Sequence, residues 1–387
     1  MSPAPERPPR RDFVLIPLII GVTALLLLGG TELVSASFFK EAQQGNCSVP
    51  DKVLPYRFRP NCSYLGKAAE GPMVRYDFND CGYRSSAACR SKPTGVTRIA
   101  LLGASTAEGF KVAYQDGLAP RVEAGLTQIC RHPVEIQDMG MAGFGPLQQY
   151  LRLNEAFDLK PDIVMLVLTP YELVDPIDPT LFANRDHPER VSNGVAQKKR
   201  GGANETEWLA RASALVSSSR AALAAQYFLF QDRQQYIKLF LLYGDKADYL
   251  RVPFTPAWRQ RFETLDILLG GMADRIHARG LPFVLVLTPQ RIQAALSDPG
   301  SRPPGVDPDA VGRRLAKIAK AHGIYFIDTY SAFRKVPAPE KLFYPVDGHM
   351  TPGGHELVAT AMIQNLGFPG ARIHELCAAP GRADTPR

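Results

Sequence analysis

TRIALLGASTAEGFK, residues 97–111, contains the pattern from which the architecture of this chain follows. The apolar run Ile99–Leu102 ends abruptly at Gly103, and Ser105 comes shortly afterwards. A short apolar run closed by a glycine is typical of a buried parallel strand that enters a tight turn. Ligands of open α/β sheets bind at the carboxyl ends of such strands. We therefore predict that Ser105 is exposed on rigid backbone at the ligand-binding edge of a sheet.

Strand and helix patterns alternate along the rest of the chain. Further apolar segments predict strands at residues 134–138, 162–168, 283–287 and 324–328. The segment DIVMLVL at 162–168 is almost continuously apolar, which is typical of a central strand covered on both faces. Helices are predicted at residues 118–130, 147–157, 208–230, 233–242, 258–279, 309–321 and about 352–366. Five strands alternating with helices indicate an α/β fold, a three-layer α/β/α sandwich with a mainly parallel sheet.

An apolar segment lies near the N-terminus. Residues 13–30 form a run of 18 residues without a charge, and three arginines precede it. This length is near the minimum for a helix that crosses a bilayer, and the arginines keep the N-terminal end in the cytoplasm. Cleavage after Ala36 is the alternative, but the run is longer than the apolar core of an ordinary signal peptide. We expect residues 1–12 in the cytoplasm, an uncleaved transmembrane signal anchor at 13–30, and the rest in the periplasm or otherwise outside the cytoplasm.

Composition and charge are those of an ordinary globular protein. The 387 residues are 45% hydrophobic and 21% charged, with a formal net charge of +7. The basic residues are scattered, and their densest cluster, Lys198–Arg200, lies in a polar loop. Because no basic stripe with interleaved aromatic residues is present, a nucleic-acid partner is not expected.

All six cysteines follow the apolar segment. They are Cys47, Cys62, Cys81, Cys89, Cys130 and Cys377. An even number on the exported side predicts disulfides, and proximity in sequence favours the local pairs Cys47 with Cys62 and Cys81 with Cys89. The expected organisation after the anchor is an irregular, disulfide-rich lead-in at 31–96, a main domain at 97–367 with an insertion at 176–255, and a C-terminal tail at 368–387.

A second polar segment, Asp347-Gly348-His349, lies between the last strand and the last helix. At this spacing the carboxylate reaches the near nitrogen of the imidazole, which orients the ring and leaves its other nitrogen free to take a proton. A base oriented in this way activates a serine hydroxyl. A metal site of Asp347, His349 and His355 is disfavoured because His355 lies inside the final helix and no fourth ligand is evident. Neither a metal nor a cofactor is expected.

Together, these segments resemble the SGNH hydrolase superfamily, also called the GDSL-like lipases and esterases, over about residues 76–367. The first family block resembles Gly103-Ala104-Ser105-Thr106 and the last resembles Asp347-Gly348-His349. The resemblance implies a flavodoxin-like sheet, with Ser105 as nucleophile, His349 as base and Asp347 as its orienting group. It also implies an oxyanion hole formed by the N–H groups of Ser105 and Gly143.

The chain departs from the family at the third block, Gly-x-Asn-Asp, where the oxyanion-hole asparagine is replaced by Tyr171. Loss of one oxyanion donor costs on the order of 10²–10³ in rate. Either the Tyr171 hydroxyl donates instead, or the two backbone N–H groups suffice, or activity is low. The nucleophile elbow of α/β-hydrolases is absent because residue 107 is alanine.

The resemblance implies a serine-dependent acyl-ester hydrolase of the esterase or deacetylase type. Exported members of the family often act on O-acyl groups of carbohydrates, so an acetylated polysaccharide is the implied substrate class. Two alternatives stay open. The same residues would serve a polysaccharide O-acetyltransferase, which passes the acyl group to a sugar hydroxyl, and a degenerate SGNH domain would serve as a carbohydrate-binding module.

Overall fold

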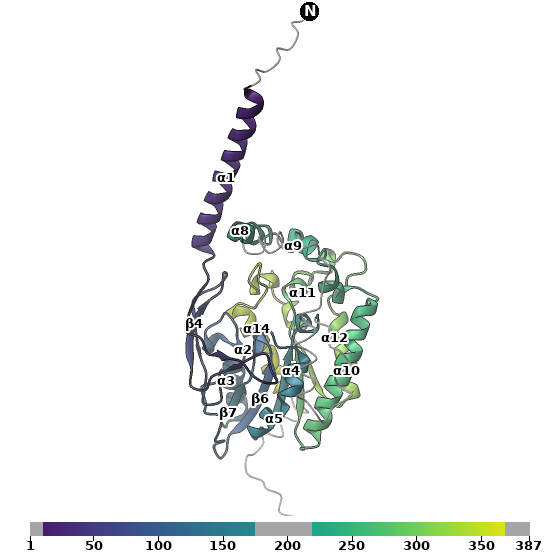
Figure 1. The fold of residues 1–387 in the computed structure, drawn as a ribbon. Coiled ribbons are helices and arrows are strands. Elements are labelled where there is room, and N and C mark those ends of the chain that lie inside the picture. Colours follow the sequence, from purple (N-terminus) through teal and green to yellow (C-terminus); the bar gives the residue numbers. More distant parts are fainter. Residues whose placement is uncertain (1–10, 175–218, 368–387) are drawn as a thin grey trace, which may run out of the picture.

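The computed structural model describes residues 11–174 and 219–367 (Figure 1). The predicted tail at 368–387 and residues 176–218 of the predicted insertion lie outside the described residues. Five strands form one sheet in the order β10-β9-β8-β6-β7, and every neighbouring pair is parallel. They are β6 (Thr97–Gly103), β7 (Val134–Asp138), β8 (Ile163–Leu168), β9 (Phe283–Leu287) and β10 (Tyr325–Asp328). This is the flavodoxin-like order, so the predicted fold class is confirmed.

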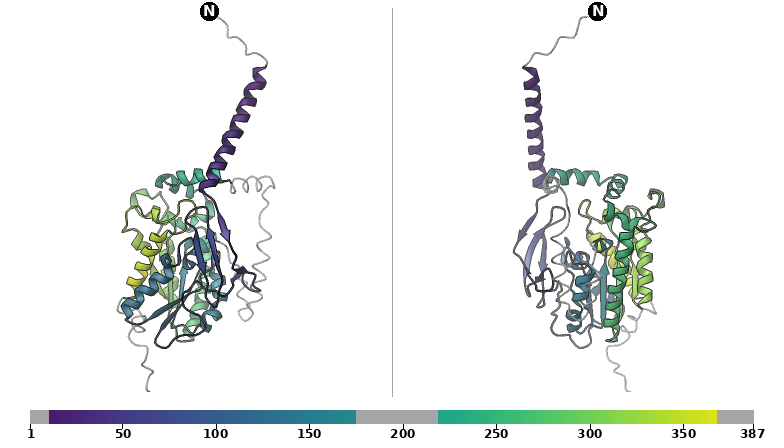
Figure 2. Two further views of the ribbon diagram at one scale, coloured as in Figure 1. Left: turned by 90° about the vertical axis from the view of Figure 1, so that its left-hand side faces the viewer. Right: turned by 45° about the vertical axis from the view of Figure 1, so that its right-hand side comes forward.

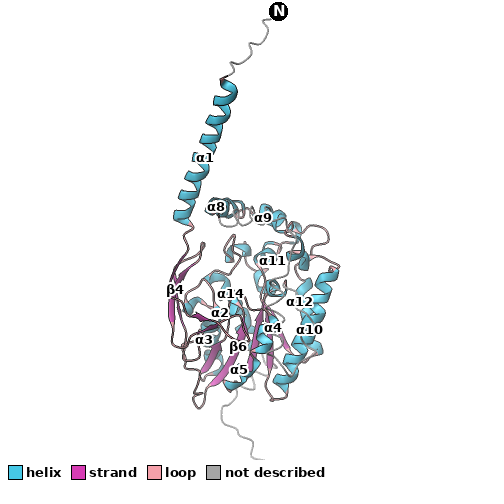
Figure 3. Ribbon diagram, in the orientation of Figure 1, coloured by secondary structure: helices cyan, strands magenta, loops and turns pink. Residues whose placement is uncertain are grey.

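Helices cover both faces of this sheet (Figure 3). The α-helices are α1 (Asp12–Phe38), α2 (Ser105–Glu108), α3 (Leu118–Cys130), α4 (Pro146–Leu151), α5 (Leu153–Asp158), α8 (Arg220–Leu229), α9 (Arg233–Phe240), α10 (Pro256–His277), α11 (Arg291–Ala295), α12 (Ala310–Ala321), α13 (Tyr330–Phe333) and α14 (Pro352–Leu366). Short 3-10 helices are η1 (Tyr114–Asp116), η2 (Pro170–Leu173), η4 (Gly244–Lys246), η5 (Asp248–Leu250), η6 (Pro299–Ser301) and η7 (Pro339–Leu342).

Two hydrophobic cores lie on opposite faces of the sheet. Successive side chains of a strand point to opposite faces. Ile99 and Leu101 of β6 accordingly lie in the core shared with α3 and α14, whereas Ala100 and Leu102 lie in the core shared with α10 and α12. Every residue of β8 is buried, as predicted for a central strand. The strand that ends before Ser105 is therefore fixed from both sides.

One predicted helix is interrupted. Residues 147–157 form two helices, α4 and α5, separated at Arg152. Arg152 has backbone angles outside the helical region (φ −85°, ψ 0°), and its buried guanidinium donates to the carbonyl of Met139. This hydrogen bond to a carbonyl outside the helix accompanies the break, which the pattern of apolar residues does not predict.

The N-terminal helix α1 is longer than predicted. It continues past residue 30 to Phe38 and projects from the domain in Figure 1. Among the described residues, Phe13–Phe38 is the one helical segment long and apolar enough to cross a bilayer, a property that an anchor shares with a signal sequence. Its apolar side chains, such as Leu25 and Leu28, are exposed.

The sequence predicts an irregular lead-in at 31–96, but the structure contains strands there. The lead-in contains a three-stranded antiparallel sheet and a two-stranded ladder. The strands are β1 (Ala42–Gln44), β2 (Ser48–Val49), β3 (Arg57–Phe58), β4 (Ser63–Lys67) and β5 (Val74–Asp77). In β5, Val74 and Tyr76 are buried while Arg75 and Asp77 are exposed. These alternating segments are too short to stand out in a sequence rich in proline.

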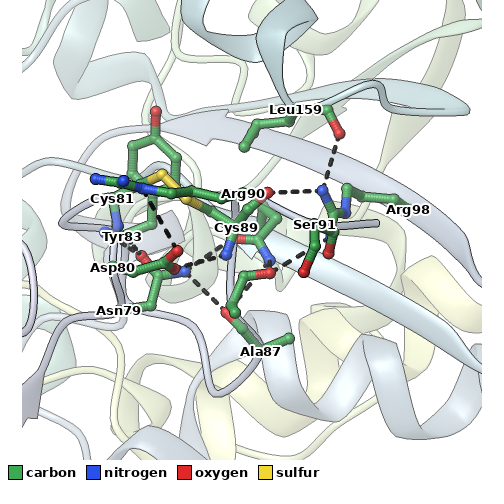
Figure 4. Close-up of a disulfide and its surroundings, with 12 residues drawn as sticks. Asn79, Asp80, Cys81, Tyr83, Ala87, Cys89, Arg90, Ser91, Arg98 and Leu159 are labelled. Carbon is green, nitrogen blue, oxygen red and sulfur yellow. Dashed lines mark hydrogen bonds and ion pairs between the residues drawn. A yellow bond between two sulfur atoms is a disulfide. The ribbon is translucent and has the colours of Figure 1, made fainter. Parts of the chain in front are cut away.

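Disulfides Cys47–Cys62 and Cys81–Cys89 join the lead-in, as predicted. Cys130 is disulfide-bonded as well, and Cys377 lies outside the described residues. Figure 4 shows how the second disulfide is tied to the sheet: the buried guanidinium of Arg98, on β6, donates to the carbonyls of Cys89 at 2.8 Å and Leu159 at 3.0 Å. The lead-in is therefore anchored to the strand that carries Ser105.

A close backbone contact generates a test of this packing. A methyl group on Gly140 would lie 2.2 Å from the backbone nitrogen of Glu108, at the end of α2. We expect Gly140→Ala to lower the free energy of unfolding by at least about 2 kcal/mol, because backbone must move to admit the methyl group. The measurement is urea unfolding of the full chain in detergent micelles, followed by the fluorescence of the buried Trp258.

The matched control is Gly95→Ala. Gly95 has a positive φ of +78°, but a methyl group there meets no atom within 4 Å, so only a backbone cost of about 1 kcal/mol is expected. Equal losses in the two variants would contradict a steric role for Gly140.

Candidate active site

Ser105 lies where the order of the strands in the sheet reverses. The chain leaves β6 for β7 on one side and then returns to β8 on the other, and this switch point is where open α/β sheets bind ligands. Ser105 is the first residue of α2, so its N–H group has no acceptor within that helix. The buried guanidinium of Arg84 donates to the carbonyls of Glu108 at 2.7 Å and Gly109 at 2.6 Å. Arg84 thus fixes the C-terminal end of the turn at residues 103–109, which we call the serine turn.

Three predicted site residues are joined by hydrogen bonds. The Oγ of Ser105 lies 2.8 Å from Nε2 of His349, although the two residues are 244 positions apart in the sequence. The other ring nitrogen, Nδ1, lies 2.5 Å from Oδ1 of Asp347. The edge of the His349 ring also packs against Phe110, with ring centroids 5.1 Å apart. We call this hydrogen-bonded series of three side chains, Ser105–His349–Asp347, the relay.

Asp347 has two partners that the sequence analysis missed. The buried ammonium of Lys111 lies 2.6 Å from Oδ2 of Asp347. The buried Glu70 accepts hydrogen bonds from the N–H groups of Val346 at 3.1 Å and Asp347 at 2.6 Å. No local pattern distinguishes Lys111 or Glu70, because each acts on a loop that is more than 230 positions away.

The electrostatics of the relay follow from these contacts. Burial alone would raise the pKa of Asp347, but the hydrogen bond and charge of His349 and the charge of Lys111 outweigh it, so this pKa lies well below its usual range. Burial raises the pKa of Glu70, and the two N–H donors only partly offset this effect. Asp347 is therefore ionised and fixed in orientation throughout the neutral pH range.

Gly143 lies in the loop between β7 and α4, with a φ of +79°. The preceding N–H groups fasten this loop to the serine turn: Met141 donates to the carbonyl of Gly103 at 3.1 Å, and Ala142 donates to Oε2 of the buried Glu108 at 2.6 Å. Burial raises the pKa of Glu108 to about 7, against the opposing effects of this bond and of Arg84. Gly143 is thus held beside the turn on which Ser105 lies.

Tyr171 and His355 do not belong to the relay. Tyr171 lies in η2, and its side chain is 66% exposed; among the described residues, no hydrogen bond joins it to Ser105 or His349. His355 is buried in the first turn of α14, where burial, followed by the charge of His349, lowers its pKa to about 3. In the described part of the chain, the one cluster of metal-type ligands is Asp80, Cys81 and Cys89, whose two sulfurs form a disulfide.

Removal of Lys111 tests the ion pair. We expect Lys111→Met to lower the free energy of unfolding by about 2 kcal/mol at pH 7, less than the typical cost of breaking a fully buried pair, because Asp347 keeps His349 and is 28% exposed. The pKa of Asp347 is lower in the folded chain than in the unfolded one. Its contribution to stability is therefore complete above the unfolded value of about 3.9 and is lost as the pH falls through the folded value.

The difference between wild type and Lys111→Met is thus expected to shrink as the pH falls below about 4. Urea unfolding in micelles at neutral and acidic pH measures it. Lys341→Met, which removes an exposed lysine from η7 of the same region, is the control and is expected to change little. A loss that does not depend on pH would contradict the pairing with Asp347.

A family model matches part of the chain. Residues 251–369 match a family model described as an SGNH hydrolase-like domain, acetyltransferase AlgX. No curated protein sequence matches the chain.

Among solved structures, a lipase/acylhydrolase from Enterococcus faecalis is 16% identical and matches over 70% of this chain and 95% of its own, with a TM-score of 0.37. A mutant of Axe2, an acetylxylan esterase from Geobacillus stearothermophilus, is 18% identical and matches over 72% of this chain and 98% of its own, with a TM-score of 0.36. The matched family segment contains β9, β10 and the loop that carries Asp347 and His349. Residues 251–369 are therefore similar to an SGNH hydrolase-like domain, and the five-stranded sheet in the flavodoxin-like order agrees with this similarity.

Proposed function

We propose that the protein is a serine-dependent acyl-ester hydrolase, anchored in the membrane by α1 and acting outside the cytoplasm on O-acylated carbohydrate. The observation that carries the proposal is the relay, in which a serine hydroxyl, an imidazole and a carboxylate are hydrogen-bonded in series at the switch point of the sheet. A base that is itself oriented by a third group is what a weak hydroxyl nucleophile needs.

The reaction proceeds through an acyl-enzyme. Oγ of Ser105 bonds to the ester carbonyl carbon while its proton passes to Nε2 of His349. The negative oxygen of the tetrahedral intermediate accepts hydrogen bonds from the N–H groups of Ser105 and Gly143. As the intermediate collapses, His349 returns the proton to the leaving alcohol. Water, activated in turn by His349, then releases the acid and restores the serine.

Asp347 and Lys111 have different roles in this scheme. Asp347 holds the imidazole in one orientation and stabilises the imidazolium. Lys111 contacts the other carboxylate oxygen and so fixes Asp347 without touching the reacting atoms. No step requires a metal or an organic cofactor.

The proposed location rests on three features: the apolar helix α1, the arginines that precede its apolar run, and the disulfides that follow it. Disulfides persist in oxidising compartments, so they support export of the domain. The carbohydrate substrate is supported by the family resemblance alone. We identify no sugar-binding residue among the described residues.

An O-acetyltransferase is the second candidate, supported by the name of the matched family, which is described as an acetyltransferase. The same acyl-enzyme would pass its acetyl group to a sugar hydroxyl. A degenerate carbohydrate-binding module is supported only by Tyr171 in place of the oxyanion-hole asparagine, and the continuous relay weighs against it.

Hydrolysis of an aryl acetate by the full chain in detergent micelles tests the proposal. We expect Ser105→Ala to lower kcat/KM by at least about 10³-fold, because the acyl-enzyme does not form. The matched control is Ser331→Ala on α13, an exposed serine outside the site, which is expected to leave the rate unchanged.

Addition of xylotetraose as acceptor separates the two enzymatic candidates. A hydrolase releases acetate in step with the aryl alcohol, whereas a transferase forms acetylated sugar faster than free acetate. Equal, background-level rates for wild type and Ser105→Ala under both conditions would overturn the enzymatic proposal.

A further inference from the structure

Helix α8 has an unusual surface. Its sequence, RAALAAQYFL, is apolar on almost every side, yet none of its residues is buried. A helix that is apolar all round is ordinarily covered by a protein core or by a membrane. Phe228 at its end is 72% exposed, and Leu242 just beyond α9 is 78% exposed, with Leu229 and Tyr243 beside them also exposed. We call residues 220–243, which include α8 and α9, the α8–α9 layer.

The α8–α9 layer is fastened to the end of α1. The carboxylate of Glu32 accepts hydrogen bonds from Ser219 Oγ at 2.7 Å and from the N–H groups of Arg220 at 2.7 Å and Ala221 at 2.9 Å. A carboxylate is favoured at this position because the N-terminus of a helix carries partial positive charge. The ring of Tyr227 also packs edge-on against Phe39, with centroids 5.4 Å apart.

This attachment fixes the height of the α8–α9 layer relative to a bilayer. The uncharged run of α1 ends at Gly30, two residues before Glu32. Its 18 residues make a helix about 27 Å long, close to the thickness of the hydrocarbon core. If this run spans the bilayer, the first turn of α8 lies at the boundary between acyl chains and headgroups. Figures 1 and 2 show α8 beside the lower end of α1.

We propose that the α8–α9 layer lies in the headgroup region of the bilayer that α1 spans, with Phe228, Leu229, Leu242 and Tyr243 directed toward the acyl chains. The inference rests on the proposed anchoring by α1, and it goes beyond that anchor to a second contact with lipid. A bilayer is favoured over another protein because the layer is continuous with α1 through Glu32. Lys238, which lines a surface hollow with Phe228, Leu229 and Asp232, matches the mixed polar and apolar character of interfacial helices.

The α8–α9 layer is also tied to the relay. The buried guanidinium of Arg291 donates to the carbonyl of Phe230, between α8 and α9, and to that of Pro345, two residues before Asp347, both at 2.5 Å. Its face stacks on the ring of Tyr236 in α9, 3.9 Å from the centroid. The end of the sheet that carries Ser105 is therefore the end turned toward the bilayer. Such an arrangement suits an acyl ester presented at the membrane surface.

Quenching by brominated lipid tests the contact. Full-chain Phe228→Trp and Leu242→Trp are each reconstituted into vesicles of phosphatidylcholine and phosphatidylglycerol, with or without bromine on the acyl chains. The emission of the added tryptophan is obtained by subtracting the wild-type signal. We expect brominated lipid to remove at least about half of it, because interfacial side chains reach the acyl boundary. Ile267→Trp, on the exposed side of α10, is the control and is expected to be quenched little.

The quenching reports lipid contact whether or not the chain hydrolyses esters, so it is independent of the proposed activity. Quenching of Phe228→Trp and Leu242→Trp no greater than that of Ile267→Trp would overturn the proposal. A concentration-dependent cross-link between copies through these positions, without quenching, would assign the layer to a dimer interface instead. A chain that does not float with the vesicles would overturn the anchor and this inference together.

Discussion

The hydrogen bond between Ser105 Oγ and His349 Nε2 is the contact on which the site depends. It joins the two ends of the domain at residues 97–367 because β6 and β10 are parallel strands of one sheet, so the loops that follow them emerge at the same edge. Buried polar contacts hold each side. Arg84 and Glu108 fix the serine turn. Glu70 and Arg291 hold the backbone of the loop at residues 345–349, which we call the histidine loop.

The electrostatic design of the site centres on Asp347. A partly buried carboxylate is costly unless it is paired. Lys111 and His349 each take one of its oxygens, and together they keep it ionised despite burial. Lys111 comes from the segment just after Ser105, so one short stretch, residues 105–111, supplies both the serine and the counter-charge of the distant aspartate. The serine turn and the histidine loop are therefore joined by an ion pair as well as by the relay.

Much of this arrangement was predictable from sequence, and the failures have physical causes. The five strands and the local disulfides follow from patterns within a few residues. The apposition of Ser105 with Asp347 and His349 was implied by the family resemblance. Lys111 and Glu70 were missed because their partners are distant in sequence. The strands of the lead-in were missed because alternation over four residues, as in β5, resembles polar loop. The break in the predicted helix at 147–157 was missed because it accompanies a contact of the buried Arg152 with a carbonyl outside the helix. The role of Tyr171 as an oxyanion donor stays a prediction, because its exposed position in η2 does not test a contact with substrate.

The central claim is that His349 activates Ser105. Covalent modification by a serine-directed fluorophosphonate, followed by mapping of the labelled peptide by mass spectrometry, tests it most directly, because labelling needs an activated hydroxyl and no particular substrate. The account predicts that the label lies on Ser105 and that His349→Ala slows labelling by at least about 100-fold. Absence of labelling, a label on another serine, or equal labelling rates in wild type and His349→Ala would contradict it.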